Sequence, residues 1–171
     1  MSKIEAVCSF IPSKQHPNVT GYVEFVEQED GVLVYVNVKG LPPGMHGIHI
    51  HNSGDLRDGC KSLCSHFNPT NKTHGNRDDK IRHVGDLGNI KVGKNGSCSC
   101  SFTDKIIKLK GKNSIIGRSV VIHKNQDDLG KGGLDKNGNI VDKKVHDESL
   151  KTGNAGARLA GAVIGYSKNM C

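Results

Sequence analysis

The sequence of 171 residues has no tryptophan, and aromatic residues make up only 4% of it. It has no apolar run of 18 residues that could cross a membrane, and no apolar segment near its start of the kind found in signal peptides. So few aromatic residues argue against a stacking platform for nucleic acid, and the lysines behind the net charge of +7 are scattered along the chain. We therefore expect a cytoplasmic protein that binds no nucleic acid and no membrane.

Glycine is abundant by contrast, with 22 positions, and this predicts frequent turns and little helix. Short β-branched runs between turn residues recur at 7–11, 21–27, 31–38, 47–51, 88–92, 97–103, 106–109, 119–123 and 160–166. In the third run Val32, Val34, Val36 and Val38 share one strand face. The pattern predicts an all-β antiparallel sandwich of about eight strands, in a single domain over residues 1–171.

Two long segments interrupt the strand pattern. Residues 52–87 are rich in His, Asp, Asn, Gly and Cys, and residues 124–157 are rich in Gly, Lys and Asp. Loops of such length are uncommon in a compact domain and are usually functional. We therefore expect both loops to serve the activity of the protein.

Histidine is frequent, with nine positions, most of them in or beside the first loop or at the end of a strand. His49 and His51 are two apart on a strand, so their rings point to one side and either share a metal or form a polar outer face. The loop then adds three more imidazoles and a carboxylate, His66, His74, His83 and Asp86, a tetrahedral donor set that suits Zn²⁺. His123 ends another strand and offers one more imidazole to the first pair. The cluster predicts a metal site.

Several motifs extend along the chain around these histidines. They include Met45-His46-Gly47-Ile48-His49-Ile50-His51, His66-Phe67-Asn68-Pro69, Arg82-His83-Val84-Gly85-Asp86, Gly117-Arg118-Ser119-Val120-Val121-Ile122-His123 and Gly153-Asn154-Ala155-Gly156-Ala157-Arg158. Together they resemble the copper/zinc superoxide dismutases over essentially the full chain. The resemblance implies a Greek-key β-sandwich that converts superoxide to dioxygen and hydrogen peroxide, with one copper and one zinc per subunit.

The resemblance also implies a role for each matching residue. Residues 52–87 become the metal-binding loop and residues 124–157 the electrostatic loop. The implied copper ligands are His49, His51, His66 and His123, and the implied zinc ligands are His66, His74, His83 and Asp86, with His66 bridging the two metals.

Other residues match positions around the metals. Asp127 would accept hydrogen bonds from His49 and His74, while His46 would hold the loop through its ring nitrogens and bind no metal. Arg158 would orient superoxide beside copper and is a catalytic residue together with His66. The implied substrate-guiding residues are Lys151, Thr152, Asp147 and Glu148.

A metallochaperone or a zinc-stabilised interaction domain on the same sandwich is the competing hypothesis. Such relatives tend to lose copper ligands or the channel arginine, whereas this sequence has all of them. The sequence therefore favours the enzyme.

The second loop is longer than the family's, because it carries an insertion from Leu134 to His146. A small hairpin around Asn137-Gly138 is one alternative, but we favour an insertion that is merely tolerated, since doubling the length of a loop costs only about 0.6 kcal/mol. His146 and His16 lie outside every motif and are expected at the surface.

The family usually forms a homodimer, and the resemblance predicts one here. Ile116, Gly117 and Ile164 fit the family's dimer surface, although Ser53 and Arg57 are less apolar or larger than the residues common there.

Cysteine departs from the family pattern. Relatives join the cysteine at the position of Cys60 to one in the final strand, where this chain has Gly161. We therefore expect free thiols, or at most a local bond from Cys60 to Cys64, with Cys171 at a mobile end. Because the family's copper chaperone couples copper delivery to that bridge, we expect that no such chaperone is required. The remaining cysteines, Cys8, Cys98 and Cys100, are expected on strands, the last two as small core thiols on the face of Phe102.

Overall fold

The computed structural model describes residues 4–12 and 17–170, so His16 and Cys171 lie outside the described residues. The described strands are β1 (Glu5–Phe10), β2 (Thr20–Gln28), β3 (Gly31–Lys39), β4 (Gly44–His51), β5 (Asp86–Val92), β6 (Ser97–Asp104), β7 (Ser119–His123), β8 (Arg158–Val163) and β9 (Gly165–Tyr166). One α-helix, α1 (Lys143–Thr152), and two short 3₁₀ helices, η1 (Gly59–Leu63) and η2 (Lys168–Met170), complete them. The expected all-β fold with little helix is confirmed, with nine strands in the described part of the chain.

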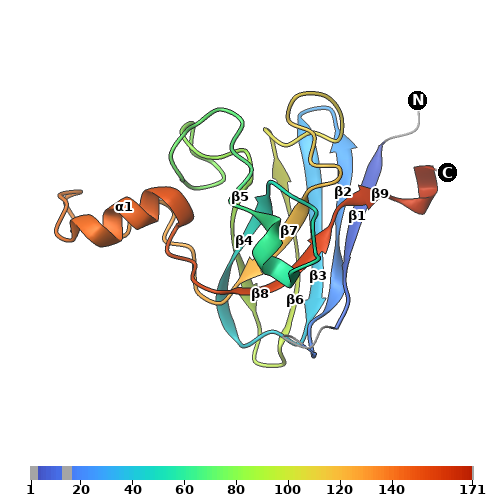
Figure 1. Ribbon diagram of the computed structural model, residues 1–171, viewed down its shortest axis with the longest axis horizontal. Coiled ribbons are helices and arrows are strands. Elements are labelled where there is room, and N and C mark those ends of the chain that lie inside the picture. The colour runs from blue at the N-terminus through green and yellow to red at the C-terminus, as the bar shows by residue number, and fades with distance from the viewer. Residues whose placement is uncertain (1–3, 13–16, 171) are drawn as a thin grey trace.

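The strands form two antiparallel sheets that face each other (Figure 1). One sheet has the order β6-β3-β2-β1-β9, and the other has the order β5-β4-β7-β8. The second sheet carries the histidine-bearing strands β4 and β7 side by side, with Ile50 paired to Val120. Residues distant in the sequence are thereby brought to one end of one sheet.

The core lies between the two sheets. The four valines that alternate along β3 are fully or almost fully buried, as are Val23 and Phe25 on the neighbouring strand β2. From the other sheet Ile48 and Ile122 point inward. Each large apolar side chain removed from water in this way contributes roughly 1.5–3 kcal/mol. The alternation along 31–38 was therefore a correct guide to the buried face.

The expected strand at 106–109 is wrong. Asp104 ends β6, and its carboxylate accepts hydrogen bonds from the backbone N–H groups of Ile106 and Ile107 at 2.8 and 2.9 Å. These bonds turn the chain, so the segment continues as a loop that is tied to Ser114 by one isolated bridge at Lys108. Ile107 and Leu109 are still buried, and this alternation is why the run looked like a strand.

The expected strand at 160–166 is divided between the sheets. β8 pairs with β7, and after Ile164 the chain crosses to pair β9 with β1 in the opposite sheet. Ile164 sits at this crossing and is only 1% exposed, so its expected place on a dimer surface is wrong. Its neighbours Val163 and Tyr166 face outward instead.

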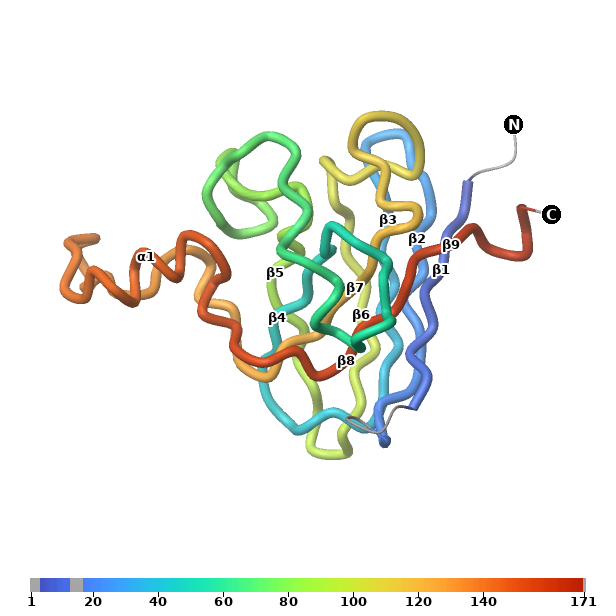
Figure 2. The backbone as a smooth tube through the Cα atoms, viewed as in Figure 1, coloured from blue at the N-terminus to red at the C-terminus, as the bar shows by residue number. Residues whose placement is uncertain are grey.

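The insertion leads into α1. Leu134 and Ile140 form an antiparallel bridge that closes a turn at Asn137-Gly138, where Gly138 has a φ of +85°. This is the small hairpin among the expected alternatives. The helix begins after Asp142, whose side chain caps the N–H of Val145, and it lies outside the two sheets (Figure 1). β1 and β9 lie on the opposite side of the molecule (Figure 2).

Cysteine side chains are free at all five described positions, which agrees with the expected absence of the family-type bridge. Cys8 and Cys98 are buried, as expected. Cys100 is exposed, so the expectation that it is a core thiol is wrong. It lies on β6, an edge strand, where a side chain on the inner face is not covered by a further strand. No helix in the described ranges has the length and apolar character needed to span a membrane.

Candidate metal centre

Strand alternation places two histidines of β4 on one side. His49 and His51 are both buried, and His123 at the end of β7 joins them from the adjacent strand. His66 approaches from the 52–85 loop and is held by a bridge to His51. One ring nitrogen from each of these four histidines lies within 4.8 Å of the others.

Each of three imidazoles in this group has one nitrogen engaged on its outer side. His51 Nδ1 donates to the carbonyl of Cys64 at 2.8 Å, and His123 Nδ1 donates to the carbonyl of Gly156 at 3.1 Å. His49 Nε2 lies 2.7 Å from Asp127 Oδ2. Because carbonyl and carboxylate oxygens accept hydrogen bonds, these nitrogens carry the protons and the opposite nitrogens present lone pairs.

The inner nitrogens of these histidines converge on one another. His49 Nδ1 is buried and has no hydrogen bond in the described structure. His51 Nε2 and His123 Nε2 lie 3.3 Å apart, both with their other nitrogen engaged. Buried lone pairs that face one another are unfavourable unless a proton or cation lies between them. The residues present therefore fit a nitrogen-ligated metal ion.

A second group shares His66 with the first. It consists of His66, His74, His83 and Asp86, all buried. Asp86 Oδ1 lies 2.9 Å from Nδ1 of His66, 2.9 Å from Nδ1 of His74 and 3.1 Å from Nδ1 of His83. Three nitrogens around one carboxylate oxygen fit a tetrahedral ion such as Zn²⁺. His66 is thus the one residue common to both groups.

Asp127 links the two groups. Its Oδ2 accepts from His49 Nε2, and its Oδ1 lies 2.8 Å from His74 Nε2. Asn89 fixes the aspartate by two bonds of 2.8 Å to its backbone N–H and carbonyl. One fully buried carboxylate therefore sets the proton position and the ring orientation of a histidine in each group.

The protonation preferences of the histidines follow from burial and charge. Burial lowers the pKa of His123 to about 4, and it lowers the pKa of His49, His51 and His66 as well. Burial also acts to lower the pKa of His74, but its bonds to Asp127 and Asp86 outweigh this and raise that pKa to about 9. The first group thus favours neutral imidazoles, the form that binds metals.

A pocket of about 310 Å³ opens onto the first group. It is lined by His51, His66, His123, Arg158 and the C-terminal part of α1 with Glu148, Lys151 and Thr152. Asp147 is not among the lining residues, and its carboxylate pairs with Lys143 at 2.8 Å. The structure therefore brings together all the expected guiding residues except Asp147.

Arg158 is held at this pocket by backbone oxygens. Its two Nη atoms donate to the carbonyls of Cys60 and Cys64. The sequence did not identify Cys64 as a residue that positions Arg158, because the contact is made by its backbone carbonyl and not by its side chain. Cys64 has a φ of +64° and a ψ of −155°, a backbone conformation that is otherwise used by glycine. This strained backbone marks Cys64 as a functional position, but it cannot be read from the sequence.

His46 lies beside these groups without joining them. Its Nδ1 and Nε2 each lie 2.8 Å from a backbone carbonyl, of His123 and of Pro42 respectively. With both nitrogens directed at carbonyls, the ring ties the segment before β4 to the end of β7, and neither nitrogen is directed at the two donor groups. His146 likewise contacts the carbonyl of Gly132 at 2.9 Å and anchors α1.

Comparison with known proteins bears on these two groups directly. The family model described as copper/zinc superoxide dismutase matches residues 19–164. The chain belongs to the copper/zinc superoxide dismutase family. It is 53% identical over 155 residues to a superoxide dismutase [Cu-Zn] of Paramecium bursaria Chlorella virus 1, covering 90% of this chain and 76% of that one.

Further relatives extend the likeness. The chain is 49% identical over 150 residues to an extracellular superoxide dismutase [Cu-Zn] of Brugia pahangi, covering 88% of this chain and 71% of the relative. A crystal structure of the clock protein EA4 superposes with a TM-score of 0.83 at 40% identity, covering 98% of this chain and 97% of that one. Copper/zinc superoxide dismutases use copper and zinc, and the two histidine groups described here are consistent with both ions.

Proposed function

We propose that this member of the family dismutates superoxide through copper held by His49, His51, His66 and His123 and zinc held by His66, His74, His83 and Asp86. The observation that carries the proposal is the sharing of His66 between two buried donor groups, one of which faces an open pocket with an arginine. A donor group that served structure alone would have no need of the pocket.

The metals and the protein contribute different parts of the reaction. Bound copper supplies the one-electron couple that dismutation requires, whereas zinc is redox-inert. The Arg158 guanidinium, fixed by two carbonyls, attracts the superoxide anion into the pocket and orients it. His66, which would be shared by both ions, would also supply a proton from its ring to the peroxide product. Two superoxide anions and two protons give one dioxygen and one hydrogen peroxide.

The charges at the rim guide the anion. Lys151 and Thr152 line the pocket with Arg158, and Glu148, which also lines it, accepts a hydrogen bond from Thr152 Oγ1 at 3.0 Å. Asp147, which pairs with Lys143, acts from further out. Focusing of an anion by such a channel raises association rates by roughly 10- to 1,000-fold. Salt screens the effect over about 8 Å at physiological ionic strength.

Metal content and superoxide consumption test the assignment together. The wild type loaded with both ions is expected to bind copper and zinc in equal amounts and to consume superoxide. A His123→Ala variant should lose activity and copper while it keeps zinc, because His123 belongs to the first group alone. A His83→Ala variant is the matched control, with zinc lost first. Zinc binding without any copper-dependent activity in the wild type would overturn the proposal.

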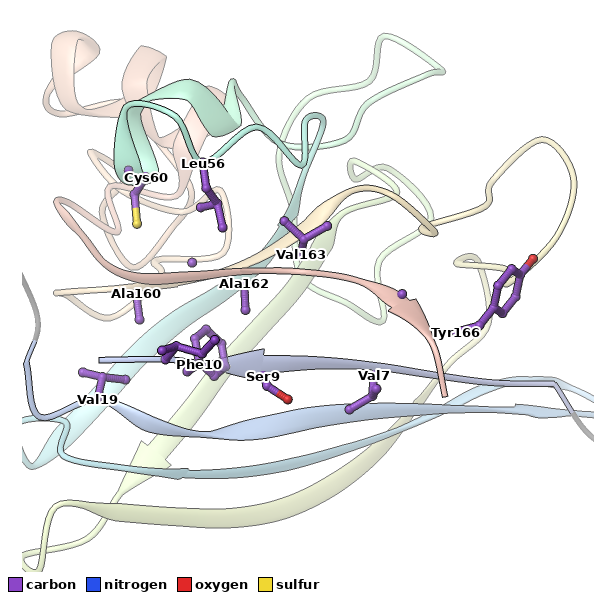
Figure 3. A pocket seen from close by; sticks show the side chains of 14 residues that line it. Val7, Ser9, Phe10, Val19, Leu56, Cys60, Ala160, Ala162, Val163 and Tyr166 are labelled. Carbon is purple, nitrogen blue, oxygen red and sulfur yellow. The ribbon is translucent and has the colours of Figure 1, made fainter. Parts of the chain in front are cut away.

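We also propose that the chain acts as a homodimer of single domains spanning residues 1–171. Leu56, Val163 and Tyr166 are 44%, 39% and 52% exposed and border one apolar pocket of about 550 Å³ (Figure 3). A second copy of the chain is the occupant that the family relationship favours. Sedimentation of the wild type and of Val163→Lys tests this, with a monomer expected only for the variant. A monomeric wild type at micromolar concentration would contradict it.

The same reasoning extends to location and maturation. We propose a cytoplasmic protein that loads copper without a chaperone that depends on a disulfide, because the five described cysteines are free and Gly161 faces Cys60. A relative is named extracellular, so fractionation of expressing cells is the direct measurement. Copper loading in cells that lack the chaperone should match loading in cells that have it. A large deficit would refute chaperone independence.

A further inference from the structure

Two cysteines on the edge of the sandwich lie together, away from the metal groups. Cys98 and Cys100 are separated by one residue on β6, and their Sγ atoms are 3.7 Å apart. β6 pairs with β3 on one side only and ends the five-stranded sheet. This is the one thiol pair within hydrogen-bonding distance in the described ranges, and nothing in the proposed reaction uses it.

The two thiols differ in access to solvent. Cys98 is 4% exposed and packs in the core, whereas Cys100 is exposed. A small oxidant in solution therefore reaches the sulfur of Cys100 first. Burial raises the pKa of Cys98 to about 12, and the adjacent Cys100 acts in the same direction. Cys98 is consequently the protonated thiol of the pair.

The strand geometry allows a bond between the two sulfurs, at some cost. Alternate residues on a strand have Cα atoms about 6.6 Å apart, near the upper end of the 4.4–6.8 Å found in disulfides. Closing the 3.7 Å gap to a covalent bond requires β6 to pucker, which an edge strand with one free side permits more easily than a central strand does. A bond made under such strain is easily reduced again.

We propose that Cys98 and Cys100 form a peroxide-sensitive dithiol that closes reversibly to a disulfide. The Cys100 thiolate attacks hydrogen peroxide, takes one oxygen to become a sulfenic acid and releases hydroxide. The Cys98 thiol then attacks the sulfenic sulfur, the S–O bond breaks, and water leaves as the S–S bond forms. The two thiols lose two electrons and the peroxide gains them.

The pair thereby protects Cys100 from the irreversible sulfinic and sulfonic acids. The source of peroxide rests on the proposed function, because dismutation releases hydrogen peroxide at the protein itself. The chemistry of the pair does not depend on that activity, since added peroxide serves equally well.

Peptide mass measurement tests the proposal on the metal-loaded full chain. Trypsin cuts after Lys94 and Lys105, so the peptide 95–105 contains both cysteines and no other. After brief exposure to hydrogen peroxide and alkylation of free thiols, this peptide should be lighter by about 2 Da than the unalkylated dithiol form, and dithiothreitol should reverse the change. Cys64 is exposed, and its Sγ donates to the carbonyl of Ser62 rather than to a thiol, so this cysteine should instead gain oxygen.

A Cys98→Ala variant is the decisive control. Without a resolving thiol, Cys100 in this variant should accumulate at least about tenfold more sulfinic acid than in the wild type. Equal amounts in the two proteins, or wild-type peptide 95–105 that gains oxygen and never loses two hydrogens, would overturn the proposal. Superoxide consumption by the same preparation is measured separately. Disulfide formation with added peroxide in a preparation that does not consume superoxide supports the dithiol and counts against dismutase activity.

Discussion

Gly161 occupies the position where relatives have the cysteine that bonds to the equivalent of Cys60. Replacing Gly161 with cysteine tests how much stability this disulfide would add to the chain. A Cβ built on Gly161 would lie 3.1 Å from Cys60 Sγ. In a disulfide with an S–S bond of about 2.05 Å, the Cβ of one cysteine lies about 3 Å from the sulfur of the other. Gly161 also has an ordinary strand conformation, so Gly161→Cys should form a disulfide with Cys60 without moving the backbone of β8.

The magnitude follows from the length of the closed loop. A bond from position 60 to position 161 closes about 100 residues, which contributes about 4.7 kcal/mol in the chain-entropy model. Against this stands the contact of the new Cβ with Leu63 Cδ1 at 2.6 Å. Relief of that contact requires a side-chain adjustment that costs about 1–3 kcal/mol. We expect a net gain of about 2–4 kcal/mol in the free energy of unfolding.

Urea unfolding of the metal-free protein measures this, because metal binding would mask the difference. The oxidised Gly161→Cys variant should unfold at higher urea than the same protein in dithiothreitol. Gly161→Ala is the control, since it introduces the same Leu63 contact without a thiol. If the oxidised and reduced variants unfolded at the same urea concentration while mass analysis showed the bond, the loop-entropy argument would be refuted for this chain.

The other predictions concern the metal centre. Arg158→Ala should lower superoxide consumption roughly tenfold with both metals retained, and wild-type activity should fall as salt is added; a salt-independent rate would show that guidance is absent. Asp127→Ala should weaken copper and zinc binding together, because it frees both His49 and His74, and loss of one metal alone would contradict the link. Cys64→Gly should stabilise the protein by about 1 kcal/mol through relief of its positive φ, measured by thermal unfolding, with an unchanged midpoint counting against strain. The metal-free protein should be most stable near pH 6.5. The lowered pKa of His123 means its contribution is lost as pH falls from 6.5 toward 4, and the raised pKa of His74 means its contribution is lost as pH rises from 6.5 through 9. Stability that rises steadily from pH 5 to 9 in calorimetry would rule this out.

The sequence alone predicted those features that depend on residue type and local spacing. His49 and His51 alternate on a strand, and four donors share one loop, so a metal cluster could be predicted before any coordinates. The valines of β3 predicted the buried face for the same reason, since period two is a local property.

The sequence predictions were wrong at positions where the conformation or exposure depends on contacts with distant parts of the chain. The burial of Ile107 and Leu109 is compatible with a strand or with a loop, and the carboxylate of Asp104 turns the chain into a loop. Ile164 was expected at the surface but points inward, because the chain crosses from one sheet to the other at this residue. Cys100 is exposed because its strand is at an edge, and strand order is not a local property of the sequence.

One carbonyl, that of Cys64, supports both the copper-group histidine His51 and the pocket arginine Arg158. The orientation of His51, which would affect the redox potential of bound copper, and the placement of the Arg158 guanidinium, which would affect anion affinity, therefore depend on the same carbonyl. A change that moves the Cys64 carbonyl should therefore alter the potential of bound copper and the salt sensitivity of the rate together. The Cys60 carbonyl accepts from Arg158 and not from His51, so a change there, or in α1, which adjoins Arg158 but contributes no ligand, should alter the salt sensitivity alone.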